Sequence, residues 1–162
     1  MRNSGKISGK SGDITVHNSN VGNGIGLYSN GYVQVGNFYN EGIILGNSGN
    51  VTANNNNVGN GIGAWSGRNI HITDIKNSGA VSGSVGAVTG YGNSAGNGIG
   101  FYSKTSEIVV ENIDNTGNIS GNSNFLVSGK ENNIGNGIGI FGNDFVTIGA
   151  VSYTHLTLPT IA

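Results

Sequence analysis

The side chains with the potential for chemistry in this sequence are a small set of acids. Two carboxylates about 5 to 9 Å apart can hydrolyse a glycosidic bond held between them. Asp74, Glu111 and Asp114 lie near equivalent places in successive copies of a repeat, but the acids are sparse and a solvated face accounts for them. We therefore predict no catalytic residue and no enzyme activity. The acids are Asp13, Glu41, Asp74, Glu107, Glu111, Asp114, Glu131 and Asp144.

Metal-binding chemistry is not indicated. His17, His71 and His155 share no position in the repeat, and the sequence has no cysteine, which excludes a thiolate zinc site. The segment 142–144, Gly-Asn-Asp, resembles part of a calcium-binding nonapeptide, but such sites need tandem copies and only one is present. We predict no metal ion.

A glycine-rich pentapeptide, Gly-Asn-Gly-Ile-Gly, resembles a phosphate-binding loop on first sight. It lacks the spacing of either nucleotide fingerprint, and no helical pattern follows it. The sequence contains four copies at steps of 37, 37 and 39 residues, which favours a structural role and predicts no cofactor. The copies begin at Gly22, Gly59, Gly96 and Gly135. A second motif, typified by Asn-Ser-Gly-x-Ile-Ser-Gly, recurs at the similar steps of 37, 37 and 38 residues, from Asn3, Asn40, Asn77 and Asn115.

Composition excludes several kinds of partner. Charged residues make up 9% of the 162 residues, against roughly a quarter in an average soluble domain. The net charge is −1 and the basic residues are scattered, so we predict no nucleic-acid partner. No apolar run approaches the ~20 residues of a membrane helix, so we predict no direct membrane insertion of this segment.

The elements that carry these motifs are predicted to be strands. Apolar residues alternate with a period of two in segments 32–35, 70–72, 108–110 and 145–148. Glycine and asparagine disfavour helix and suit tight corners. We therefore predict an all-β fold, a parallel β-helix (β-solenoid) of four roughly 37-residue repeats spanning residues 1–150. Each repeat fits either one broad coil or two narrow ones.

Stacking the repeats places equivalent residues above one another. The inward ladder should be Ile25, Ile62, Ile99 and Ile138, with Leu27, Ala64, Phe101 and Ile140 on the same face. A parallel amide ladder should link Asn23, Asn60, Asn97 and Asn136.

The candidate binding residues form an aromatic ladder on the opposite side of the same strands: Tyr28, Trp65, Tyr102 and Phe141. Two interpretations remain open. Exposed aromatics would bind sugars or a protein groove. Alternatively, the variable segments before each pentapeptide, at 10–20, 47–57, 84–94 and 122–133, cover the ladder as surface loops or as an additional, less regular strand.

The two motifs, with an aromatic residue and Ser after the pentapeptide, resemble the passenger region of bacterial autotransporter adhesins and related haemagglutinin-like exoproteins. The resemblance covers Asn3 to about Ala150 and implies a right-handed parallel β-helix, exported through the outer membrane to the cell surface. It implies a non-enzymatic stalk or adhesin segment whose partner is a host or bacterial surface glycan or a protein receptor. The alternatives are a fragment of a β-helical polysaccharide-degrading enzyme and a structural, fibre-like solenoid.

The two ends of the sequence depart from the repeat. Met1 stands two residues before the first Asn-x-Gly, inside a repeat, so we interpret it as an internal residue of a longer protein; the alternative is a true start with a frayed first repeat. Residues 151–160 resemble a translated sequencing adapter, and we predict that 151–162 is a non-native tail rather than a natural strand cap.

Overall fold

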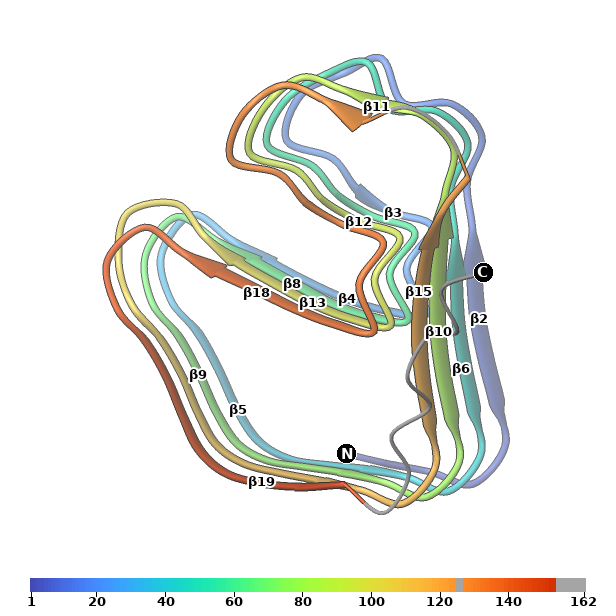
Figure 1. Ribbon diagram of the computed structural model, residues 1–162, viewed down its shortest axis with the longest axis vertical. Helices are drawn as coiled ribbons and strands as arrows, with labels where there is room; N and C mark the ends of the chain where they lie inside the picture. The colour runs from blue at the N-terminus through green and yellow to red at the C-terminus, as the bar shows by residue number, and fades with distance from the viewer. Residues whose placement is uncertain (125–126, 154–162) are drawn as a thin grey trace, which may run out of the picture.

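The computed structural model describes residues 1–124 and 127–153 of the 162-residue chain (Figure 1). None of these residues is helical, and the strands pair in parallel with the equivalent strands of the neighbouring repeat. The prediction of an all-β parallel β-solenoid with about four 37-residue turns is therefore confirmed. Each repeat forms one broad coil, because Ile25, Ile62, Ile99 and Ile138 pair in succession.

Three sheets enclose the main core. The first is bent and contains β1 (Arg2–Asn3), β5 (Val33–Asn40), β9 (Ile70–Asn77), β14 (Ile108–Asn115) and β19 (Val146–Tyr153). The second contains β2 (Lys6–Lys10), β6 (Ile43–Asn47), β10 (Ala80–Val85) and β15 (Asn118–Ser123). The third contains β4 (Ile25–Ser29), β8 (Ile62–Ser66), β13 (Ile99–Ser103) and β18 (Ile138–Gly142).

A side lobe, at the top of Figure 1, is built from the segments that precede the pentapeptides. It contains two sets of short strands: β3 (Asn20–Val21), β7 (Asn57–Val58), β12 (Ser94–Ala95) and β17 (Asn133–Ile134), and β11 (Val88–Thr89) with β16 (Val127–Ser128). Bridges from Ile14 to Val51 and from Val51 to Val88 continue the second set. The variable segments thus include additional short strands, with an apolar cluster of their own: Ile14, Val51, Val58, Val85, Val88 and Ala95.

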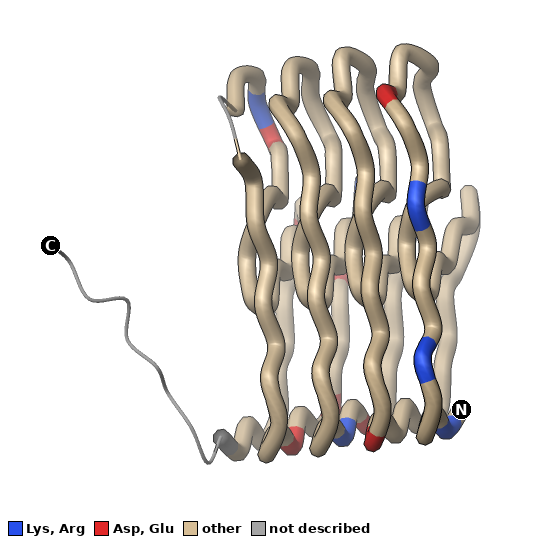
Figure 2. The backbone as a smooth tube through the Cα atoms, turned by 90° about the vertical axis from the view of Figure 1, so that its right-hand side faces the viewer, with Lys and Arg blue, Asp and Glu red and all other residues tan. Residues whose placement is uncertain are grey.

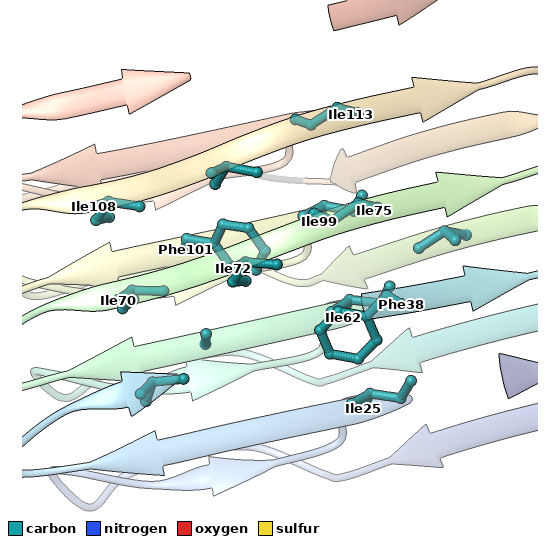
Figure 3. Close-up of a cluster of buried hydrophobic side chains, with 14 of the residues drawn as sticks. Ile25, Phe38, Ile62, Ile70, Ile72, Ile75, Ile99, Phe101, Ile108 and Ile113 are labelled. Carbon is teal, nitrogen blue, oxygen red and sulfur yellow. The ribbon is translucent and has the colours of Figure 1, made fainter. Parts of the chain in front are cut away.

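The main core is a stack of apolar rows (Figure 3). Ile62 and Ile99 are buried on the inner face of the third sheet, and Ile25 and Ile138 continue their row at the two ends. Ala64 beside Phe101 shows how a small and a large residue fill one row between them. Burying each large side chain is worth about 1.5 to 3 kcal/mol, so repetition of the rows accounts for a stable stack without disulfides.

The first sheet bends because its strands change the face that they bury. In β9, Ile70 and Ile72 are buried by simple alternation, but Thr73 and Asp74 are both only half-buried before Ile75 is buried again. The additional half-buried residue interrupts the strict alternation and turns the strand around the core. A single long strand therefore encloses two sides of the coil (Figure 1).

The first glycine of the pentapeptide is required by the backbone. The φ angle is positive at all four copies, for example +63° at Gly59, a conformation that costs other residues about 1 to 2 kcal/mol. A Cβ atom at Gly59 would also lie 2.4 Å from the carbonyl oxygen of Ser84. This glycine therefore forms the corner at which the chain leaves the side lobe and enters the third sheet.

Two asparagine ladders run through the coil. In the pentapeptides, the amide nitrogens of Asn60 and Asn97 each donate to the side-chain oxygen of the preceding copy, at 3.2 and 3.0 Å. The backbone N–H groups of the same residues donate to the same oxygens, both at 2.9 Å. Asn136 continues this ladder onto Asn97.

The second ladder comes from the other motif and was not predicted as a ladder. Asn3, Asn40 and Asn77 each donate from Nδ2 to the amide oxygen of the next copy, ending at Asn115, over 2.7 to 2.8 Å. All four side chains are buried. Hydrogen bonding along the stack satisfies these polar groups, which would otherwise be costly to bury.

Candidate functional site

The four aromatic residues of the predicted binding ladder are stacked along the third sheet. Their rings are parallel within 6 to 7°. The centroid distances are 4.6 Å from Tyr28 to Trp65, 6.2 Å from Trp65 to Tyr102 and 5.0 Å from Tyr102 to Phe141. The register of β4, β8, β13 and β18 sets this geometry, since it places the four residues directly opposite one another.

The ladder faces away from the main core, but the side lobe covers it. Trp65 is 3% exposed and Tyr102 is 2% exposed, while Tyr28 and Phe141 at the two ends are half-buried. A Cβ atom at Gly92, in the side lobe, would lie 3.2 Å from the hydroxyl oxygen of Tyr102. The sequence left two interpretations of the ladder open. The structure agrees with the second, in which the variable segments cover the aromatic rings. The central rings offer no surface to a sugar or to a protein groove.

Burial also affects the ionisation of the two tyrosines. Burial raises the pKa of Tyr28 above its usual value of 10.0. Burial, assisted by the negative charge of Glu131, raises the pKa of Tyr102 to about 12. Both effects disfavour a phenolate, because a charge would lie in a poorly solvated space between the sheet and the side lobe.

The indole nitrogen of Trp65 is buried and has no hydrogen-bond partner among the described residues. An unsatisfied buried donor costs free energy, so Trp65 contributes through packing and ring stacking rather than through its N–H group. The ladder is thus a second core between the third sheet and the side lobe, and it fixes the lobe in place.

The acids that the sequence marked as candidates for glycosidic-bond hydrolysis do not face one another. Asp74 lies opposite Asn112, whose Nδ2 donates to it at 2.8 Å, and Asp114 lies opposite Lys76. Glu111 contacts His71 instead, with 2.8 Å between Oε1 and Nε2. These pairings distribute the acids along the surface of the first sheet.

The histidines likewise occupy separate places. The Nδ1 atom of His17, in the side lobe, accepts the backbone N–H of Asn54 at 2.9 Å, whereas His71 lies on the first sheet. His155 lies outside the described residues. Within residues 1–124 and 127–153, no three acid, histidine or cysteine side chains come close enough to hold a metal ion.

Charge is sparse on the surface as well. Figure 2 shows the second sheet, where the described lysines of the sheet are confined to β2, at Lys6 and Lys10. The equivalent positions in β6 are Ile43 and Asn47, so the described strands of this sheet carry no basic stripe. The described part of the chain forms no helix long and apolar enough to cross a membrane.

Tyr32 and Phe145, two exposed aromatics beside the first sheet, were not recognised as candidate binding residues from the sequence. Tyr32 is 64% exposed and Phe145 is 69% exposed, on the outer surface of the first sheet. They occupy the same place in the first and fourth coils, but Asn69 and Glu107 stand between them. Because the intervening residues are polar, the two aromatics do not form a repeated motif, and only the coil register relates them.

The folded chain belongs structurally to the class of β-solenoids, whose repeats contact only their neighbours and extend along one axis. That fold fits a stalk or a fibre-like segment. Comparison with models of protein families, with curated proteins and with solved structures found no match.

Proposed function

We propose that this chain is a segment of a non-enzymatic stalk or adhesin of a bacterial autotransporter-like protein, exported and displayed at the cell surface. The stalk holds binding regions away from the cell. Surface glycans or protein receptors are the partners that this role implies. The two sequence motifs and their likeness to adhesin passenger repeats support the cellular location, and the solenoid supports the mechanical role.

The observation that carries the proposal is the continuity of the ladders. Buried asparagine amides link Asn3 to Asn115, and stacked rings link Tyr28 to Phe141. Each coil adds one strand spacing of about 4.8 Å, so further coils of the same kind lengthen the rod without changing its cross-section. A rod stiffened from inside is suited to projecting a binding region.

The polysaccharide-degrading enzyme remains the second candidate. It is disfavoured by the separate partners of Asp74 and Glu111, which leave no two of the candidate acids opposite each other. The third candidate, a structural fibre, uses the same rod but needs no export to a cell surface.

Antibodies raised against the folded chain test the location. They should label intact bacteria that carry the gene, at a level close to that of permeabilised cells. An antibody against a cytoplasmic protein, which should label only permeabilised cells, is the control for membrane integrity. Labelling that requires permeabilisation would exclude surface display and leave the fibre or another internal role.

A further inference from the structure

The outer surface of the first sheet carries a row of four residues, each directly before a strand. Val33, Ile70, Ile108 and Val146 pair in register, so the residues that precede them lie side by side. The backbone confirms this order, because Val33 donates to the carbonyl of Asn69, Ile70 to that of Glu107, and Ile108 to that of Phe145. We name these four residues the outer row: Tyr32, Asn69, Glu107 and Phe145.

The outer row has an exposed aromatic ring at each end. Tyr32 is 64% exposed and Phe145 is 69% exposed, in contrast to Trp65 and Tyr102, the buried central rings of the aromatic ladder. Three strand spacings separate them, which is roughly 14 Å. The guanidinium carbon of Arg68 lies 5.8 Å from the centre of the Tyr32 ring, a cation–π contact that restrains the ring while leaving most of it in solvent.

Oriented polar groups lie between the two rings. Asn69 donates from Nδ2 to Oε1 of Glu107 at 3.1 Å, and His71 is held by Glu111 at 2.8 Å. Together with Tyr32 and Gln34, the side chains of Asn69, His71 and Glu107 line a hollow over β5, β9 and β14, and Glu111 lies beside it. Amide, carboxylate and imidazole groups that hydrogen-bond to one another retain further donors and acceptors for a ligand.

We propose that the outer row and its hollow bind a neutral, extended oligosaccharide lying along the axis of the solenoid. The C–H face of one sugar stacks on Tyr32 and that of another on Phe145, since an aromatic face is apolar and electron-rich. The hydroxyl groups of the intervening sugars hydrogen-bond to Asn69, Glu107 and His71.

Charge sets the preference for a neutral sugar. Glu107 lies in the row, Glu111 lies beside the hollow, and Asp144 directly precedes Phe145, whereas Arg68 brings one positive charge at the Tyr32 end. A uronic acid or a sialic acid would bring a carboxylate close to these acids, and like charges repel. The site is independent of the proposed display at a cell surface, because it is formed entirely by residues of the folded coils.

Isothermal titration of the 162-residue chain with cellotetraose and with chitotetraose tests the proposal. At least one of the two should bind, and the tetramer should bind more tightly than its monomer, because only the longer sugar reaches both rings. The double variant Tyr32→Ala, Phe145→Ala should bind at least about tenfold more weakly. Tyr91→Ala is the matched control, since Tyr91 is 50% exposed but lies in the side lobe.

A second variant tests the charge argument. Asp144→Asn removes a negative charge next to Phe145 without altering a group that contacts the sugar. This variant should retain binding of the neutral sugar and should improve binding of tetragalacturonate, an acidic sugar that the unaltered chain binds poorly. The proposal is overturned if neither neutral tetramer binds at millimolar concentration. Equal binding by the double variant and the unaltered chain would also overturn it. Neither result bears on antibody labelling of intact cells, so the site and the surface location fail independently.

Discussion

The rings of Trp65 and Tyr102 lie parallel within 6°, with their centroids 6.2 Å apart, and both are almost completely buried although they face away from the main core. They join the third sheet to the side lobe. The chain therefore contains two apolar clusters and, between the third sheet and the side lobe, one stack of aromatic rings, rather than a single core with loops around it.

The buried aromatic ladder should contribute strongly to stability. Trp65→Ala should lower the free energy of unfolding by about 3 to 5 kcal/mol, because it leaves a cavity between the sheet and the side lobe. Tyr32→Ala, at an exposed ring, should change it by no more than about 0.5 kcal/mol. Urea unfolding followed by circular dichroism measures both. Equal effects would mean that the ladder is not enclosed in solution.

The raised pKa of Tyr102 predicts a loss of stability at high pH. The unfolded side chain ionises near 10.0 and the folded one near 12, so the folded state disfavours the charged form. The contribution of Tyr102 is fully present below pH 10 and is lost as pH rises toward 12. Tyr102→Phe removes this titration, and its unfolding free energy should fall less steeply over that range in urea titrations. Parallel pH profiles for the two proteins would contradict the prediction.

The corner glycines should tolerate no side chain. Gly59→Ala should destabilise the fold by about 1 to 3 kcal/mol, because φ is +63° and the new Cβ atom would lie 2.4 Å from a carbonyl oxygen. Gly36→Ala is the matched control, since no atom lies within 4 Å of a Cβ at that position. The midpoint temperature of thermal unfolding should fall for Gly59→Ala alone. A similar fall in both variants would refute the corner role.

The second asparagine ladder should behave as a set of coupled buried amides. Asn77→Ala removes the acceptor of Asn40 and the donor to Asn115, and each buried group left without a partner costs about 1 to 3 kcal/mol. Asn30→Ala, at an exposed position, should be close to neutral. Denaturant titration of both variants checks the contrast, and comparable stabilities would show that the ladder adds nothing to the fold.

Asn-Gly sequences should differ in their rate of deamidation, a reaction in which the following backbone nitrogen attacks the side-chain carbonyl carbon. Asn60 is fully buried and the N–H group of Gly61 donates to the carbonyl of Asn97 at 2.9 Å. Asn30 is exposed, and Gly31 donates only to the hydroxyl of Ser29. Mass spectrometry of peptides after prolonged incubation should detect acid at Asn30 first. Faster conversion at Asn60 would contradict the ladder geometry.

The repeat spacing was sufficient to predict the strands, the parallel pairing and the inward ladder of Ile25, because one register relates every repeat to the next. For the side lobe, the sequence left surface loops and an additional, less regular strand as alternatives. Its segments differ in sequence from coil to coil, and strands of two residues, such as Asn57–Val58, are too short for alternation to be visible.

The structure describes only the first part of the predicted non-native tail. β19 extends through Val151 to Tyr153, which pairs with Asn115 at the place where the earlier coils carry asparagine. Residues 154–162, where the rest of the adapter-like segment falls, lie outside the described residues. The interpretation of 151–162 as a non-native tail stays a prediction.

The sequence alone was enough to establish the β-solenoid, because a pentapeptide repeated four times imposes the same corner and the same inward residue on every coil. Which aromatics are accessible depends instead on how the segments pack together. Tyr102 lies within β13 and Tyr32 lies directly before β5, but the side lobe folds over Tyr102 and leaves Tyr32 in solvent. That difference arises from contacts between segments that have no common pattern, so no local rule in the sequence distinguishes the two side chains.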